Sequence, residues 1–209
     1  NWGWDDVLPY FKKSEDHYAG GDDMHGSGGE WRVEEQRLSW DILDKFREAC
    51  IAAGIPAIDD FNRGNNEGVG YFQVNQRRGW RWSSSTAFLA PARGRKNLTV
   101  LTGATAQQIV MKGLKVAGLR FHHHNREALA SCRREVILCS GAIGTPQLLQ
   151  LSGIGAPELL QSNGITVRHN LPGVGQNLQD HLQIRAIYKV KNVRTCLLYT
   201  SPSPRDTVT

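Results

Sequence analysis

The sequence predicts a mixed α/β protein, because helix-like and strand-like patterns follow one another along its 209 residues. Apolar residues recur at helical spacing over 5–16 and 39–53, which predicts two amphipathic helices. β-Branched residues gather over 97–111, and 134–140 has the continuous apolar pattern of a strand that is covered on both faces. The composition, with 40% hydrophobic and 22% charged residues, is ordinary for a globular protein.

The ends of the two helices carry recognisable signals. Acidic residues fall in the first turn of 5–16 and basic residues come after them, as the helix dipole favours. Ser39 is a suitable N-cap for the second helix, and Gly54 followed by Pro56 ends it. Further along, the pattern predicts a strand over 71–76, a short helix over 83–91, a β-meander from 97 onward, a helix over 156–162 and a strand over 165–168.

Charge, hydropathy and cysteine spacing argue against several classes of function. The net charge of +5 is spread over short basic groups, which favours a solvated basic face over nucleic acid binding. No apolar run approaches ~20 residues, so no membrane span is predicted. Cys50, Cys132, Cys139 and Cys196 show no CxxC spacing, and we expect reduced thiols in a cytoplasmic protein. Peripheral attachment to the inner membrane stays open.

Three consecutive histidines, His122–His124, are the most visible candidate for a metal site. Neighbouring side chains of a strand point to opposite faces, so these three cannot converge on one ion. No cysteine or carboxylate lies at ligand spacing from them. We therefore predict a solvent-facing hairpin end here and no metal site in the chain.

The stretch Ser140–Gly155, SGAIGTPQLLQLSGIG, predicts a turn into a helix directly after the apolar segment. Gly141, Ala142 and Gly144 let the backbone approach a ligand closely, Thr145 could cap the helix, and Pro146 suits its first position. A helix N-terminus favours an anion or an electron-rich ring system. The stretch matches neither G-x-G-x-x-G nor the phosphate-binding loop, so a purely structural turn is an equal alternative.

A second glycine-rich loop, LPGVGQNLQDH, ends in an Asp-His pair. Asp180 could orient His181 as a general base. Asparagine and aspartate also make ordinary hydrogen bonds within turns, and the residues alone favour this simpler interpretation.

Three segments together resemble the glucose–methanol–choline (GMC) oxidoreductase family. LCSGAIGTPQLLQLSGIG is similar to the second signature of that family, and NLPGVGQNLQDHLQIR is similar to the segment that follows it. NWGWDDVLPYFKKSEDHY resembles the helix after the first flavin motif. The order and the separations also fit, and the resemblance covers about residues 1–190.

The resemblance implies a partial FAD-binding Rossmann-like domain, interleaved with part of a substrate domain built on an antiparallel sheet. It implies FAD as cofactor, a small-molecule alcohol as substrate and hydride transfer to the flavin. The electron acceptor is not indicated. The residues expected to line the cofactor site are Ala106, Ser140, Gly141, Ala142, Gly144, Thr145, Asn177, Asp180 and His181.

The sequence also departs from the family pattern. The family's G-x-G-x-x-G strand is expected upstream of Asn1, and its general-base histidine is expected beyond Thr209, so no catalytic residue is assigned. Gln183 stands where choline-oxidising members carry glutamate, which favours an uncharged alcohol over choline. A cyanohydrin lyase on the same scaffold and a non-catalytic binding module are further alternatives.

The resemblance divides the chain into four expected parts. Residues 1–96 form a helical part similar to the substrate domain, and 97–155 supply strands of the FAD domain with the second signature. Residues 156–194 return towards the substrate domain. The tail, 195–209, contains CLLYTSPSPRD, which resembles the translation of a transposase-type sequencing adapter, so we expect it not to be natural protein sequence.

Overall fold

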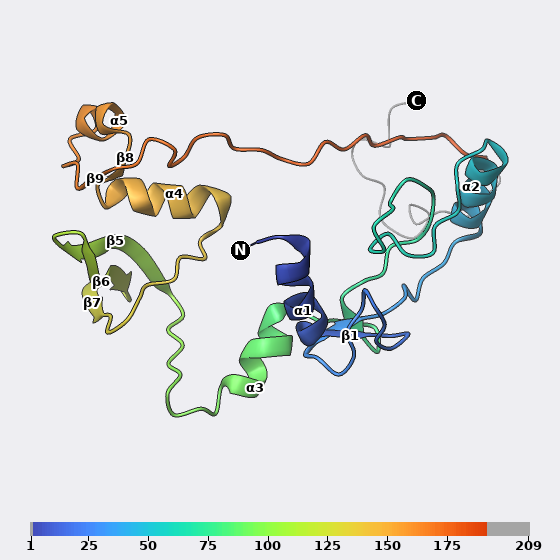
Figure 1. Ribbon diagram of the computed structural model, residues 1–209, viewed down its shortest axis with the longest axis horizontal. Helices are drawn as coiled ribbons and strands as arrows, with labels where there is room; N and C mark the ends of the chain where they lie inside the picture. The colour runs from blue at the N-terminus through green and yellow to red at the C-terminus, as the bar shows by residue number, and fades with distance from the viewer. Residues whose placement is uncertain (1, 192–209) are drawn as a thin grey trace. The chain divides into compact units, whose positions relative to one another are not determined.

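A computed structural model describes residues 2–191 of the chain (Figure 1). These residues form two compact units. The first unit contains residues 2–99 together with 187–191, and the second is Val100–Ala186. The expected adapter-like tail, 195–209, and Cys196 lie outside the described residues. Cys50, Cys132 and Cys139 are free thiols.

The first unit begins with helix α1, Trp4–Ser14, in agreement with the predicted helix over 5–16. Asp5 and Asp6 lie in its first turn, and two lysines lie in its last turn. The chain passes directly into β1, Glu15–His17, which pairs in parallel with β2, Trp31–Val33. Helix α1 therefore fixes the direction of the strand that carries Glu15 and His17.

Helix α2, Asp41–Ala52, confirms the second predicted helix but corrects its start. The N-cap is Trp40, whose carbonyl accepts the amides of Leu43 and Asp44, so Ser39 does not cap this helix. Past the helix end, Gly54 adopts a φ of +93°, a conformation that glycine reaches without a steric penalty.

The rest of the first unit is built of short elements. Strands β3, Gln76–Arg77, and β4, Trp80–Arg81, form a hairpin. The predicted strand over 71–76 is wrong for most of its length, because Val74 makes only an isolated bridge with Glu34. The predicted helix over 83–91 exists as a π-helical turn, Ser85–Leu89, that continues into α3, Ala90–Ala92.

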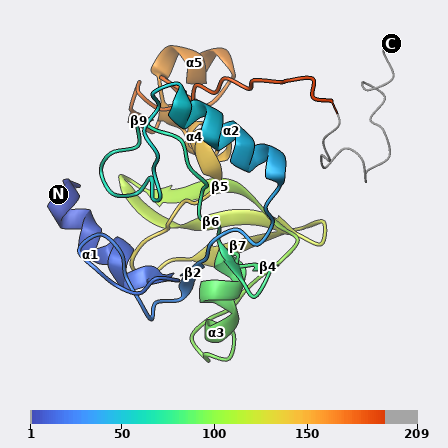
Figure 2. The same cartoon turned by 90° about the vertical axis from the view of Figure 1, so that its right-hand side faces the viewer.

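The second unit is centred on an antiparallel meander (Figure 2). Its strands are β5, Ala104–Lys112, β6, Lys115–His123, and β7, Arg126–Ser131. His123 pairs with Arg126, and His124 and Asn125 adopt positive φ angles in the turn between β6 and β7. The histidine run therefore lies at a hairpin end, as predicted.

Helix α4, Gly141–Leu151, packs beside β5. It is followed by β8, Ile154–Gly155, by α5, Pro157–Ser162, and by β9, His169–Asn170, which pairs in parallel with β8. The buried apolar side chains of this unit are Ile109, Leu148, Ile154 and Leu160. Ile109 and Leu148 lie where α4 packs on β5.

Two predicted strands of the second unit are not formed. The apolar stretch 134–140 has no paired neighbour among the described residues, although a strand of this pattern needs a partner to satisfy its backbone groups. The stretch 165–168 is also not a strand, because the Ile165 amide bonds to the Leu160 carbonyl and completes the end of α5. Pairing begins one residue later, at His169.

Within residues 2–191, the structure has no helix that combines the length and the apolar character needed to cross a bilayer.

Candidate functional site

The predicted cofactor segment Ser140–Thr145 forms the entrance to α4. The helix begins at Gly141, so Thr145 is not its N-cap and Pro146 lies inside the helix, which corrects both predictions. Thr145 still satisfies the backbone at this end, because its Oγ1 accepts the amide of Ser140 at 3.1 Å. The side chain therefore closes the turn from within the helix.

The first turn of α4 leaves its backbone open to a ligand. Gly141 has a φ of +80°, and a Cβ atom at this position would meet nothing within 4 Å. Gly141 and Ala142 are exposed, and the first amides of a helix have no partner within the helix. Such amides and the helix dipole suit an anion or an electron-rich ring. The segment thus fits a flavin group that lies against it.

The other end of α4 is fixed to the meander. Ser152, directly after the helix, is fully buried and accepts the Ile109 amide at 2.8 Å, while it donates to the Leu148 carbonyl at 2.6 Å. The Gln108 amide group also reaches the Leu151 carbonyl at 3.4 Å. These contacts hold the open first turn of α4 at a fixed place relative to β5.

The second glycine loop lies next to α4. The Gln150 side chain donates to the Val174 carbonyl at 3.2 Å, and a Cβ atom on Gly175 would come within 2.8 Å of the same amide nitrogen. The structure therefore brings the two glycine-rich segments of the sequence together. Glycine at position 175 permits this contact and has a φ of +81°.

The remaining predicted site residues, Ala106, Asn177, Asp180 and His181, are exposed. Ala106 lies on β5 opposite Phe121, beside an irregularity in the strand register. Asn177 adopts a φ of +55°, and Asp180 accepts the backbone amide of the adjacent His181 at 2.8 Å. The Asp180 carboxylate thus contacts the backbone of His181.

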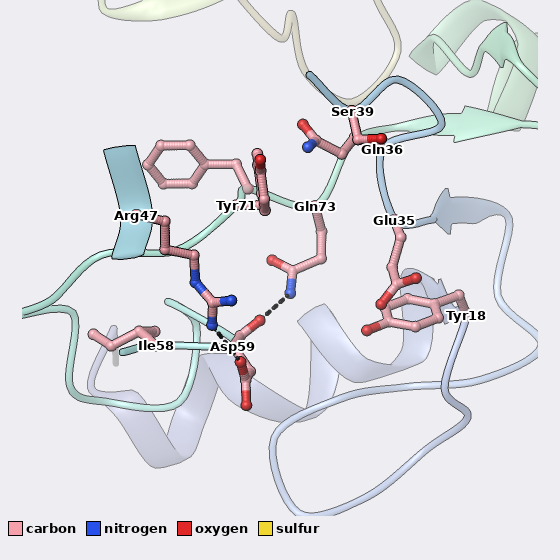
Figure 3. A pocket seen from close by; sticks show the side chains of 10 residues that line it. Tyr18, Glu35, Gln36, Ser39, Arg47, Ile58, Asp59, Tyr71 and Gln73 are labelled. Carbon is pink, nitrogen blue, oxygen red and sulfur yellow. Dashed lines mark hydrogen bonds and ion pairs between the residues drawn. The ribbon is translucent and has the colours of Figure 1, made fainter. Parts of the chain in front are cut away.

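The first unit contains a polar cavity of about 340 Å³, shown in Figure 3. Asp59 organises one side: its carboxylate accepts Arg47 at 3.3 Å, and its carbonyl accepts Gln73 at 3.0 Å. Glu35 lies beside the Tyr18 hydroxyl and raises the pKa of Tyr18. The cavity can hydrogen-bond a small polar molecule, but no histidine lines it.

A second cavity of the same unit, about 530 Å³, combines an apolar wall with two histidines. Trp4, Leu8 and Phe11 of α1 form part of the wall, and His17 and His25 stand at its polar side. Both histidines are only 4% exposed. Their rings stack with centroids 4.0 Å apart.

His25 is the centre of a buried polar cluster. Its Nδ1 lies 3.0 Å from Glu15 Oε2, and its Nε2 lies 2.8 Å from Asp60 Oδ2. Arg63 contacts the same Asp60 oxygen at 3.3 Å. Burial raises the pKa of Asp60, but the Asn62 amide and His25 outweigh it and leave the pKa below its usual value.

His17 completes this cluster without a hydrogen bond to its Nε2, which is buried and unpartnered among the described residues. Burial and the neighbouring His25 lower the pKa of His17. Sequence analysis missed this group, because His17, His25 and Asp60 follow no ligand motif and meet only through the folding of separate loops. The spacing of these three residues in the sequence does not predict that their side chains are buried next to one another.

Comparison with known proteins decides the family. Residues 1–183 match the family model described as GMC oxidoreductase. The chain belongs to this family. The resemblance stated on the two glycine-rich segments and the N-terminal helix is thereby confirmed.

Relatives of the GMC oxidoreductase chain include proteins named oxygen-dependent choline dehydrogenase. One from Pectobacterium carotovorum is 39% identical over 193 residues, which are 91% of this chain and 34% of that protein. One from Acinetobacter baumannii is 41% identical over 196 residues, which are 91% of this chain and 36% of that protein. The chain therefore spans about a third of the length of these relatives.

Solved structures give the same assignment of fold. Pyridoxine 4-oxidase from Mesorbium loti matches 82% of this chain and 34% of its own, with a TM-score of 0.77 and 35% identity. An FAD-dependent oxidoreductase from Chaetomium thermophilum matches 86% of this chain and 34% of its own, with a TM-score of 0.80 and 28% identity. The mixed α/β fold class predicted from the sequence is confirmed by these neighbours.

Proposed function

We propose that the chain is part of an enzyme that binds FAD and oxidises an alcohol by hydride transfer to the flavin. The observation that carries the proposal is the open first turn of α4, Gly141–Gly144, in a chain of the GMC oxidoreductase family. A solved relative with 28% identity is named an FAD-dependent oxidoreductase, which supports the same cofactor here.

The residues proposed to hold the cofactor have distinct tasks. The amides of Ala142 and Gly144 would face an electron-rich part of the flavin, and Thr145 would keep the Ser140 turn closed. Ala106 on β5 and the loop residues Asn177, Asp180 and His181 would line more distant parts of the site. When bound, FAD accepts the hydride from the alcohol carbon, and the protein supplies binding and orientation.

The proposed substrate is an uncharged alcohol. Gln183 offers a neutral amide near the Asp-His segment, whereas a quaternary ammonium group is best met by a carboxylate or an aromatic cage. Choline is the second candidate, because relatives that are 39% and 41% identical are named choline dehydrogenases. The two candidates differ in the charge of the substrate and not in the reaction.

The test uses the parent protein, by which we mean the complete gene product that contains these residues. We expect it to purify with bound flavin, and an alcohol added without oxygen should bleach the flavin absorption. A parent protein that folds without flavin, or whose flavin no alcohol reduces, would contradict the proposal. The first result would favour a binding module, and the second would favour a lyase.

A matched pair of substrates separates the two alcohol classes. Choline is compared with its uncharged isostere, in which a tert-butyl group replaces the trimethylammonium group. We expect a higher kcat/KM for the isostere, and we expect Gln183→Glu to shift the ratio towards choline at least several-fold. A preference for choline in the unmodified protein would show that Gln183 does not set the specificity.

A further inference from the structure

The buried cluster of His17, His25 and Asp60 has the composition of a metal site. Each residue offers one ligand atom, and the three atoms lie within 4.8 Å of one another. Two imidazoles and one carboxylate with a free fourth position form a ligand set that zinc adopts in proteins. We propose that these three residues bind one divalent transition-metal ion, with Zn²⁺ as the preferred ion.

His17 is the observation that distinguishes this cluster from an ordinary polar core. The residue is only 4% exposed, and its Nε2 has no hydrogen-bond partner among the described residues. Leaving a buried polar atom without a partner is unfavourable, because the atom loses its hydrogen bonds to water and gains none in the protein. A metal ion would satisfy the His17 ring in a way that no neighbouring protein group does.

The surroundings of His25 and Asp60 match those of metal ligands. Glu15 Oε2 binds Nδ1 of His25 at 3.0 Å, which orients the ring and leaves Nε2 to face Asp60. Histidines that bind metals commonly donate their other ring N–H to a carboxylate in this way. Asp60 is in turn held by the Asn62 amide at 2.8 Å and by Arg63.

Binding the ion requires a local rearrangement of the three side chains. Tetrahedral ligand atoms about 2.0–2.1 Å from Zn²⁺ lie roughly 3.3 Å apart. The His25 and Asp60 atoms, now 2.8 Å apart, must therefore separate slightly, and a proton carried by His25 Nε2 is released to solvent when the ion binds. His17 must turn out of its stack on His25 so that its lone pair meets the ion.

The cavity beside the cluster provides access and a place for the fourth ligand. His17, His25 and Glu15 all line this space of about 530 Å³, so a water molecule can reach the ion from it. Nitrogen ligands disfavour Mg²⁺ and Ca²⁺, which bind oxygen atoms. The expected ion is therefore Zn²⁺, with Co²⁺ as a chemical substitute. The site does not depend on the proposed flavin chemistry.

The test measures zinc bound to the parent protein after removal of metals with a chelator. Equilibrium dialysis of the unmodified protein against Zn²⁺ should give one equivalent of bound zinc. His17→Phe and Asp60→Asn should each reduce the affinity for zinc more than tenfold, so that this equivalent is lost. Glu15→Gln should weaken binding about 10–100-fold, as expected for a partner of a ligand. The double variant His123→Gln, His124→Gln, which removes two adjacent histidines at the β6–β7 turn, should bind zinc like the unmodified protein.

Two further measurements keep the result independent of folding defects. Circular dichroism checks that each variant is folded, and zinc-edge X-ray absorption of the unmodified protein should show two imidazole ligands. Absence of bound zinc in the unmodified protein, or equal loss in the His123/His124 control, overturns the proposal. In that event the cluster is a hydrogen-bonded polar core, or the zinc is an adventitious ion only.

Discussion

The Ser152 hydroxyl accepts the backbone amide of Ile109 at 2.8 Å, across 43 positions of the sequence. This bond joins the end of α4 to the middle of β5, and both partners are buried. It is the buried one of two polar contacts described above that join β5 to the end of the helix carrying the proposed flavin segment. Its loss is therefore expected to affect stability and cofactor binding together.

Ser152→Ala tests this contact. The variant leaves the Ile109 amide buried without a partner, so we expect a loss of about 1–3 kcal/mol in the free energy of unfolding. Urea denaturation of the parent protein measures it. Ser162→Ala is the matched control, because the Ser162 hydroxyl donates to the Leu159 carbonyl at 2.9 Å on the exposed side of α5. Equal destabilisation by both variants would show that burial of the Ser152 bond is unimportant.

Ala142→Leu tests the proposed flavin contact. Ala142 is exposed in the first turn of α4, so a larger side chain there extends into the space proposed for the flavin. We expect the flavin content of the purified parent protein to fall at least several-fold, without a change in its circular dichroism. Ala130→Leu makes the same replacement at an exposed position of β7 and should keep its flavin. Retention of flavin by both variants would show that the cofactor does not bind against the first turn of α4.

Acid is expected to weaken the first unit through two carboxyl groups. Burial raises the pKa of Asp16, but the Gly28 amide and the Arg32 guanidinium outweigh it, so the pKa lies below its usual value of 3.8. The Arg63 guanidinium holds the pKa of Asp22 well below its usual range. As the pH falls below the pKa of the unfolded chain, the unfolded chain takes up protons first, and the folded chain loses relative stability.

This stabilisation is therefore complete above about pH 5 and is lost progressively as the pH falls through the pKa values of the folded carboxyl groups. The free energy of unfolding is measured by tryptophan fluorescence in urea titrations at a series of pH values from about pH 6 down to about pH 3. This range spans the ordinary carboxyl pKa of about 4. Arg32→Gln removes one partner of Asp16 and should make the dependence on pH shallower. An unchanged slope in this variant would contradict the assigned cause.

Local patterns allowed much of the fold to be predicted. The helix at 4–14, the helix at 157–162 and the turn at 124–125 follow from spacing and turn residues that lie within a few positions of one another. The stretch 134–140 was predicted as a strand from its apolar run, yet a strand also needs a neighbour, and a local pattern carries no information about one. The cap at Ser39 was wrong by one residue for a similar reason, since several residues there could begin the helix.

In the candidate site, too, features set by neighbouring residues were predicted and contacts between distant segments were not. The turn of Gly141 and Ala142 was predicted because glycine before an apolar helix is a local signal. The contact between Gln150 and the Val174 carbonyl joins segments that the sequence treats as separate motifs. The histidine cluster of the first unit was not predicted at all. Its members come from positions 17, 25 and 60, and only the folded chain brings their side chains close together.

The unpaired stretch 134–140 has a consequence for the order in which the protein folds. Strands β5, β6 and β7 are consecutive in the chain, so each can pair with its neighbour soon after synthesis. The next stretch leaves Ile137 75% exposed and has no adjacent strand from the described residues, so any partner must come from a distant part of the sequence. Closing that long loop is slow. We therefore expect this segment to fold later than the β5–β7 meander.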